Sequence, residues 1–316
     1  NSFTEEITMK RLLILLCFLP ILTFGQYRAD RARTNPNVTD GNGYCFRGHT
    51  ATAVSAYCAE ATALFARMTT PPTETRKGQI NTLITSLKTA GVWTKLDVFY
   101  VFAAADQQAA LLNWKGDTNN ATAVNSPSFV ADSGFKSDGS TSWVNTHYNP
   151  YVDSVNFSIL SAHISVYVVT NAGVGDKFDI GVVHYTTDYS NTFINSNDGG
   201  SRILGGICID GFYGGYAAVT NSLGLSAIDR SAGTQKYYKN GTYITSSTRA
   251  VRPTPDVEFS VGTMNYNFLG SISQAGYSPR RIAQAAIGGA LSAPEEASYS
   301  TALEVYMDAV GCGVIP

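Results

Sequence analysis

The sequence predicts a mainly β protein whose strands form a two-sheet sandwich, with helices at each end of the folded part. Charged residues make up only 15% of the 316 residues, below the average of about 25% for soluble domains. Gly (29) and Tyr (18) are frequent, as in folds with many tight turns. From residue 95 onward, short apolar runs alternate with clusters of Gly, Asn, Asp and Ser. This alternation favours a sandwich over a helical bundle.

The first 25 residues have the three parts of a secretory signal peptide. A positive stretch at 9–11 precedes an apolar run at 12–24, and small residues lie at positions −3 and −1 of a cut after Gly25. The residues before position 9 are interpreted as upstream read-through. We expect a mature chain that is secreted or held at the cell surface, beginning with a flexible polar leader over 26–48.

A helical segment packed on the sandwich is expected at 49–94. Alternation of Ala with larger apolar residues over 50–68 favours a first helix, which a Pro-Pro pair ends. A second helix begins after an N-cap at Thr73 or Thr75 and ends before Gly91. Its apolar residues recur with the helical period: Ile80, Leu83, Ile84 and Leu87. This face must pack on another part of the chain.

The sandwich is expected over 95–316. It begins with a strand-like apolar run at 96–104, followed by a short helix capped by Asp106. A C-terminal helix is predicted at 294–309, with Ser292 as its N-cap. Further strands are predicted at 142–146, 157–170, 178–185, 203–209, 216–220, 235–245, 257–264 and 281–287.

The charge balance excludes an electrostatic nucleic-acid partner. The net charge is −2 for the whole chain and stays at −2 after removal of residues 1–25. A protein that collects phosphates needs a basic field. Beyond residue 25, no apolar stretch reaches the roughly 20 residues of a membrane-spanning helix. We therefore expect neither nucleic acid as a partner nor a membrane span.

The cysteines that follow the signal peptide are Cys45, Cys58, Cys208 and Cys312. An even number in an exported chain suggests disulfides, and the connectivity is open. Proximity favours Cys45 with Cys58, which leaves Cys208 to pair with Cys312, although one or both pairs could stay reduced. A zinc site is disfavoured, because no C-x-x-C pair or His cluster accompanies these residues.

Three motifs resemble concanavalin A-like, laminin-G-like jelly rolls. Residues 237–244 (YYKNGTYI) match a Y-x-N-G hairpin, in which Asn240-Gly241 supplies the positive φ angles of a two-residue turn. Residues 281–296 contain a late strand, a small-residue turn and L-S-x-x-E, and residues 134–143 (GFKSDGSTSW) match an early strand. The resemblance implies a jelly-roll sandwich. Residues 70–104 also resemble uncharacterised phage and prophage proteins with such a jelly roll behind a helical preamble.

No catalytic motif accompanies the resemblance. Glucanases of this fold carry E-x-D-x-x-E and related alginate lyases carry R-T-E-x-R and Q-I-H, none of which occurs here. A G-x-S-x-G nucleophile elbow is also absent from the sequence. Asp256 and Glu258 would share one face of a strand, but two solvated acids at a strand start explain them better. His163 and His184, in apolar strands, fit core or sheet-face positions.

Aromatic residues interleaved with Asn and Asp are the candidate sugar-binding positions. Aromatic faces stack on pyranose rings, and amide or carboxylate side chains bind the hydroxyls. Packing at sandwich edges is the alternative role of these tyrosines. The candidates lie in three segments interpreted as loops: Tyr189 and Asn191; Asp210, Tyr213 and Tyr216; Asn265 and Tyr266.

Calcium is the cofactor that such loops could hold. Asp and Asn side chains and backbone carbonyls are its usual ligands. The weak candidates are Asn197 and Asp198, with a second Asx-rich stretch at 117–120. Ordinary Asx turns explain both stretches without a metal.

The function expected from this sequence is non-catalytic recognition of a surface or extracellular polysaccharide or glycoconjugate. One alternative is a structural subunit of a phage particle or surface assembly, which binds no sugar and could be a homo-oligomer. Another is a carbohydrate-active hydrolase or lyase of an unrecognised type. A concave, aromatic-lined groove would favour recognition, whereas large exposed apolar patches would favour the structural subunit.

Overall fold

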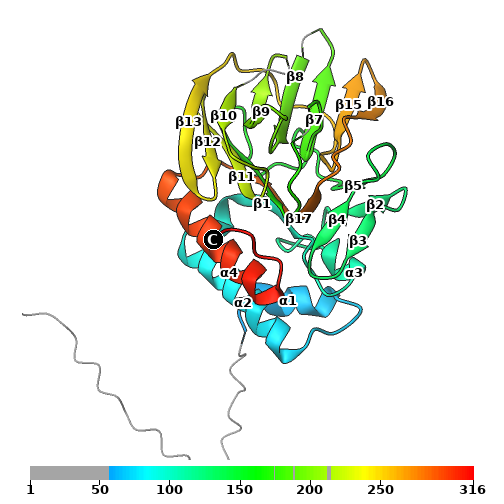
Figure 1. The fold of residues 1–316 in the computed structure, drawn as a ribbon, viewed down its shortest axis with the longest axis vertical. Coiled ribbons are helices and arrows are strands. Elements are labelled where there is room, and N and C mark those ends of the chain that lie inside the picture. Colours follow the sequence, from blue (N-terminus) through cyan, green and yellow to red (C-terminus); the bar gives the residue numbers. More distant parts are fainter. Residues whose placement is uncertain (1–56, 174, 188, 212–214) are drawn as a thin grey trace, which may run out of the picture. The chain divides into compact units, whose positions relative to one another are not determined.

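Two β-sheets packed face to face form the centre of the structure, and helices cover the outer face of one of them (Figure 1). This computed structural model describes residues 57–173, 175–187, 189–211 and 215–316. The mainly β sandwich with a C-terminal helix confirms the predicted fold class. The expected signal peptide and leader lie outside the described residues, as do Cys45 and Tyr213.

The helical layer begins with α1 (Ala59–Arg67) and α2 (Glu74–Thr89). Thr73 caps α2, since its hydroxyl accepts a hydrogen bond from the backbone N–H of Arg76 at 3.2 Å. The predicted apolar face of α2 is confirmed, because all of its members are buried: Ile80, Leu83, Ile84 and Leu87. A short 3₁₀ turn, η1 (Trp93–Lys95), leads from α2 into the first strand.

Two further helices lie later in the chain, α3 (Gln107–Ala110) and α4 (Ala293–Val310). Asp106 caps α3 as predicted, accepting a hydrogen bond from Ala109 N at 2.9 Å. Ser292 caps α4 within a capping box, in which the Glu295 carboxylate accepts from Ser292 N at 2.7 Å. Helix α4 packs beside α2 (Figure 1).

The first sheet, sheet A, lies under these helices. Its strands follow the order β13-β12-β11-β6-β17-β4-β3, and β1 pairs with β17. All of its pairings are antiparallel. The bounds are β1 (Leu96–Val101), β3 (Ser128–Val130), β4 (Gly134–Lys136), β6 (Ser161–Val168), β11 (Gly224–Ser231), β12 (Thr234–Lys239), β13 (Thr242–Thr248) and β17 (Arg281–Gly288).

The second sheet, sheet B, has the order β10-β9-β8-β7-β14-β5-β2. A hairpin of two further strands joins it through a parallel pairing of β15 with β7. The bounds are β2 (Thr122–Val124), β5 (Trp143–Asn145), β7 (Ile180–Tyr185), β8 (Tyr189–Asn195), β9 (Arg202–Ile209), β10 (Tyr216–Ala218), β14 (Ser260–Val261), β15 (Met264–Phe268) and β16 (Ser271–Ala275).

Strand alternation distributes side chains between two large hydrophobic cores. On β6, Ile164 and Val166 point into the core between the sheets, whereas Tyr167 points to the core beneath the helices. The helix-facing core also contains Leu303 of α4 and Leu87 of α2. The central strands of sheet A are therefore buried on both faces, which explains why β6 is almost continuously buried.

The turn chemistry of the sequence is confirmed at the β12–β13 hairpin. Asn240 and Gly241 have φ angles of 51° and 73°, the left-handed values that a two-residue turn requires. The prediction misses the strands β2, β3, β8, β11, β15 and β16, and it interprets the segments of β8 and β15 as loops. Strands β8, β11 and β15 contain polar side chains that the structure buries, such as Asn191, Thr192 and Asp229, so their apolar alternation is interrupted.

The expected pairing of Cys208 with Cys312 is wrong. Both thiols are free and buried. Cys208 belongs to the core between the sheets, and Cys312 to the core beneath the helices, so sheet A separates them. Cys58 lies half-buried at the start of α1, and its pairing with Cys45 stays a prediction because Cys45 lies outside the described residues.

Within the described ranges, no helix is long and apolar enough to cross a membrane.

Two residues of α4 test whether the helical layer is part of the cooperative fold. Leu303 is fully buried, whereas Val305 is 53% exposed. We expect Leu303→Ala to lower the free energy of unfolding by about 2–5 kcal/mol because it leaves a cavity. Val305→Ala should change it by no more than about 0.5 kcal/mol. Urea denaturation measures both, and equal effects of the two variants would show that α4 does not unfold with the sandwich.

Candidate functional site

The candidate site is a groove of about 790 Å³ at one open edge of the sandwich. In the described part of the chain, β10 of sheet B and β13 of sheet A have no further strand paired to their outer edges. These two edge strands contact each other, and the groove runs along them. We call it the edge groove. It is lined by Gly200, Ser201, Arg202, Tyr216, Ala218, Val219, Thr220, Asn221, Lys239, Asn240, Thr242, Ile244 and Pro316.

Tyr216 provides an aromatic surface in the edge groove. It begins β10, and its side chain is 62% exposed, because the strand turns the next side chain, Ala217, into the core. The guanidinium of Arg202, on the neighbouring strand β9, lies 5.0 Å from the centre of the Tyr216 ring. This separation allows a cation–π interaction, which fixes the orientation of the ring.

Arg202 is held in place by the turn that precedes β9. Its Nε and Nη2 atoms lie 2.8 Å and 2.6 Å from Oδ2 of Asp198. Asp198 N in turn donates to the Arg202 carbonyl at 2.9 Å, and Asp198 Oδ1 accepts from Gly200 N at 2.8 Å. Two contacts of the guanidinium with one carboxylate oxygen and a closed turn therefore define its position over Tyr216.

Asn197 and Asp198, the weak calcium candidates, are the corner of this turn. Asn197 Oδ1 accepts a hydrogen bond from Gly199 N at 3.0 Å, and the Asp198 carboxylate faces Arg202. This is an Asx turn with an ion pair. Binding of calcium here stays a prediction.

Polar and apolar side chains both line the rest of the edge groove. Lys239 Nζ donates to the Ser222 carbonyl at 3.2 Å and to Ser226 Oγ at 3.1 Å. Burial lowers the pKa of Lys239 to about 7, and the charge of Asp179 opposes this effect. Asn221 Oδ1 accepts from Leu223 N at 2.9 Å. The groove thus offers one aromatic face together with amide, hydroxyl and cationic groups.

The sequence-predicted binding residues do not form one site. Tyr216 lies in the edge groove. It is level with Asn195 of β8, because Tyr216 and Asn195 both pair with Leu204 of β9. Tyr189 stands at the opposite end of β8, six residues from Asn195 and therefore about 20 Å away. Asp210 follows β9, and its carboxylate lies 3.3 Å from a guanidinium nitrogen of Arg252.

Of the remaining candidates, Asn265 pairs with Val182 and lies on the inner face of sheet B, whereas Asn191 and Tyr266 pair with Val183 and lie on its outer face. Asn191 and Asn265 are buried, and Asn265 Nδ2 donates to the Glu258 carbonyl at 2.8 Å. Tyr266 packs on the small hydrophobic cluster of the outer face, which contains Phe193 and Val183. Asn191 and Asn265 are therefore less accessible to a ligand than Tyr216.

Tyr189 belongs to a partly exposed aromatic and aliphatic group that we call the hairpin-tip patch, formed by Tyr185, Tyr189, Phe268 and Leu269. The rings of Tyr185 and Phe268 are stacked, with centroids 4.6 Å apart, and Tyr185 lies 4.5 Å from Tyr189. The β15–β16 hairpin and β7 lie on the right of Figure 1, whereas β10 and β13 lie on the left.

The acidic pair considered for catalysis is engaged in hydrogen bonds. Asp256 Oδ1 accepts from Asn149 Nδ2 at 2.8 Å, and Glu258 Oε2 accepts from Asn145 Nδ2 at 2.7 Å. The strand predicted from residue 257 begins only at Ser260, so the expectation that both acids share one face of a strand is wrong.

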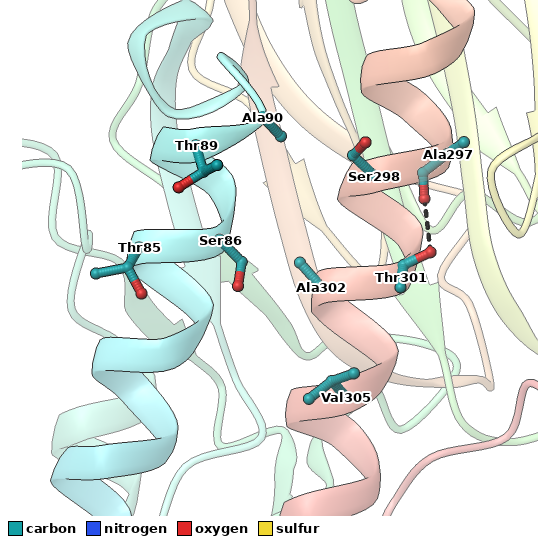
Figure 2. A pocket seen from close by; sticks show the side chains of 9 residues that line it. All are labelled: Thr85, Ser86, Thr89, Ala90, Ala297, Ser298, Thr301, Ala302 and Val305. Atoms are coloured by element: carbon teal, nitrogen blue, oxygen red, sulfur yellow. Dashed lines mark hydrogen bonds between the residues drawn. The ribbon is translucent and has the colours of Figure 1, made fainter. Parts of the chain in front are cut away.

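A second groove, of about 680 Å³, lies between α2 and α4 (Figure 2). Short side chains line it, among them Ser86 and Thr89 of α2 and Ser298, Thr301 and Val305 of α4. Its lining contains no aromatic ring and no charged group. We therefore place the candidate site in the edge groove.

Nothing in the sequence indicates Arg202, Asn221 or Lys239 as site residues. Arg202 begins β9, Lys239 ends β12 and Asn221 lies between β10 and β11, and the three have no common motif. Only the cross-strand pairing of β9 with β10, and the approach of sheet A to sheet B at the open edge, bring them to Tyr216. No local pattern could have indicated this.

The chain was compared with protein-family models, curated proteins and solved structures. No family model and no curated protein matches it. Among solved structures, it is similar to a mutant of Trypanosoma rangeli sialidase displaying trans-sialidase activity, at 12% identity and a TM-score of 0.47, over 73% of this chain and 38% of that chain.

Two toxin structures are similar at the same level. The botulinum neurotoxin serotype D binding domain matches at 12% identity and a TM-score of 0.44, over 68% of this chain and 52% of that chain. The binding domain of Paraclostridial Mosquitocidal Protein 1 matches at 13% identity and a TM-score of 0.43, over 67% and 53%. The chain thus spans about half or less of each, and likenesses this distant carry no argument about its ligand or chemistry.

The lowered pKa of Lys239, which lines the edge groove, can be tested through the pH dependence of stability. Its pKa is about 7 in the folded protein, against about 10.4 for an unfolded-chain lysine, so the unfolded state binds the proton more tightly. The effect of Lys239 is that the free energy of unfolding is highest above about pH 10.4. It decreases by up to about 1.4 kcal/mol per pH unit as the pH falls to about 7.

Lys239→Met removes the titration and keeps most of the apolar stem. We expect the stability of the variant, relative to the wild type, to increase as the pH falls from 10 to 7 and to level off below 7. Urea denaturation at a series of pH values measures this difference. A difference that is constant from pH 7 to 10 would contradict the lowered pKa.

Proposed function

We propose that this protein is a non-catalytic recognition module that binds a surface or extracellular polysaccharide or glycoconjugate in the edge groove. The observation that carries the proposal is the exposed ring of Tyr216, oriented by Arg202 at 5.0 Å. The C–H face of a pyranose is apolar and stacks on such a ring, whereas its hydroxyls need donors and acceptors at the edges.

The rest of the groove supports a sugar as the ligand. Thr220, Asn221 and Thr242 present hydroxyl and amide groups along its walls. Its volume of about 790 Å³ lies within the range of about 300–1,000 Å³ that is typical of small-molecule sites. A ring flanked by polar groups would fix the orientation of a bound saccharide.

The sequence motifs suggest the fold family and the cellular location of the protein. The Y-x-N-G hairpin and the early and late strand motifs resemble concanavalin A-like, laminin-G-like jelly rolls, and the N-terminal segment resembles a secretory signal peptide. We infer a protein exported to the cell surface or medium, where polysaccharides are accessible. This placement rests on fold-level analogy.

Tyr216 is the residue whose replacement tests the proposal. We expect Tyr216→Ala to weaken binding to a glycan or polysaccharide array at least tenfold, because the stacking surface is lost. Tyr216→Phe should retain most of the binding. Tyr189→Ala is the matched control: it removes an exposed tyrosine about 20 Å away on the same sheet.

Three outcomes would contradict the groove as the sugar site. They are array binding that survives Tyr216→Ala unchanged, binding that is lost with Tyr189→Ala instead, and no binding of any glycan by a well-folded wild-type protein. Far-UV circular dichroism and the melting temperature of each variant distinguish loss of the site from loss of the fold.

A second candidate function, a subunit of a phage particle or surface assembly, is favoured by the hairpin-tip patch. Leu269 is 66% exposed and has a φ of 51°. A bulky residue rarely adopts such a φ, and Asn or Gly would be more stable there. An exposed, strained leucine beside Phe268 suits a surface that a second copy of the chain covers.

Sedimentation measures this alternative. A structural subunit should associate with rising concentration, and Leu269→Asn should return it to the monomer while raising its melting temperature. Ser273→Asn, a polar substitution on the same hairpin, serves as the control. A wild-type protein that stays monomeric at every concentration would contradict the hypothesis of a structural subunit.

A further inference from the structure

A fully buried group of three ionisable side chains lies between sheet A and α4, remote from the edge groove. His163 is on β6, Asp229 is directly opposite on β11, and Glu296 is in the first turn of α4. Their exposed fractions are 0%, 1% and 0%. Buried ionisable side chains are rare unless they are paired or bind a metal.

The three side chains converge on one point. His163 Nδ1 lies 3.1 Å from Asp229 Oδ1 and 3.0 Å from Glu296 Oε1, and one ligand atom from each residue lies within 4.8 Å of the other two. Ligands of a tetrahedral Zn²⁺, at bond lengths of about 2.0–2.1 Å, are separated by about 3.3 Å. The two separations from His163 Nδ1 to the carboxylate oxygens are a few tenths of an ångström shorter than this value.

The imidazole is oriented as in a metal site. His163 Nε2 lies 3.0 Å from Ser165 Oγ, and Ser165 Oγ lies 3.1 Å from Tyr299 Oη. Donation from Nε2 to the hydroxyl leaves the lone pair of Nδ1 directed at the carboxylates. A hydrogen bond from the second ring nitrogen is the usual means by which proteins orient a ligating histidine. Asp229 Oδ1 is likewise fixed, by Leu291 N at 2.7 Å.

Glu296 supplies an independent indication that the group binds a cation. Its Oε1 lies 3.0 Å from His163 Nδ1, but Glu296 Oε2 and Asp229 Oδ2 are buried and have no hydrogen-bond donor among the described residues. No Lys or Arg of the described residues forms an ion pair with either carboxylate. With a neutral imidazole the group carries a charge of −2 in a water-free environment, which is costly without a cation.

Tyr238 of β12 provides a further oxygen on the same face of the sheet. It pairs with Ala227, two residues before Asp229, and its hydroxyl is buried without a hydrogen-bond partner. Burial, together with the charges of Asp229 and Glu296, raises the pKa of Tyr238 to about 12.

We propose that His163, Asp229 and Glu296 bind a divalent transition metal, with Zn²⁺ as the first candidate. One nitrogen and carboxylate oxygens form a ligand set that Zn²⁺ accepts. The site is closed on all sides, so the metal has a structural role. It connects two strands of sheet A to α4 and thereby attaches the C-terminal helix to the sandwich.

Protonation of His163 and Glu296 is the alternative to metal binding. Without a metal, burial and Asp229 raise the pKa of Glu296 to about 8, and the two carboxylates outweigh burial to raise the pKa of His163 to about 10. A protonated network could then hold α4 without any ion. Metal content distinguishes the two arrangements directly.

The experiment uses the mature chain, purified without a histidine tag and stripped with a chelator. We expect uptake of about one Zn²⁺ per chain by elemental analysis, and a melting temperature several degrees higher in the loaded protein than in the stripped protein. Co²⁺ in the same site should show visible absorption bands of a low-symmetry N/O site. No stoichiometric uptake and an unchanged melting temperature would overturn the proposal in favour of the protonated network.

Matched variants assign the uptake to these ligands. His163→Gln and Glu296→Gln should lose it, together with the shift in melting temperature. His184→Gln, a histidine of sheet B, and Glu295→Gln, the neighbour of Glu296 on α4, should retain both. Uptake that persists in His163→Gln and Glu296→Gln would place the metal elsewhere and contradict the proposal. The wild-type measurement stands even where a variant does not fold.

Discussion

The open edge of the sandwich depends on one buried ion pair, between Arg280 and Asp179. Both side chains are fully buried, and Arg280 Nη1 lies 3.0 Å and 2.8 Å from the two oxygens of Asp179. The same guanidinium donates to the carbonyls of Ala172 and Asn197. A buried pair is tolerated only when its remaining groups are satisfied in this way. It thereby fixes loops that are far apart in the sequence.

The edge groove follows from this constraint. Asn197 begins the turn in which Asp198 closes on Arg202, so the buried pair positions the guanidinium that covers Tyr216. Edge strands expose unpaired backbone groups and usually need protection. Here the edges of β10 and β13 approach each other and flank a groove with polar and apolar lining residues, which is the proposed ligand site.

Local signals in the sequence predicted local structure. The cap at Ser292, the turn at Asn240-Gly241 and the apolar face of α2 depend on neighbouring residues, and all are present. The signals failed where polar side chains are buried, as with Asn191 in β8. His163 was rightly assigned to a buried strand, but its partners come from β11 and α4, so only the tertiary fold shows them. The same holds for the groove around Tyr216.

The most direct test of the central claim is an NMR titration of the protein with the tightest-binding oligosaccharide, observed on the tyrosine rings and the arginine Nε–H groups. The account predicts that the ring signals of Tyr216 and the Nε–H of Arg202 shift first and saturate together, while those of Tyr189 and Tyr266 stay unchanged. Shifts confined to Tyr189 and Tyr266, with Tyr216 unaffected, would contradict the edge groove as the binding site.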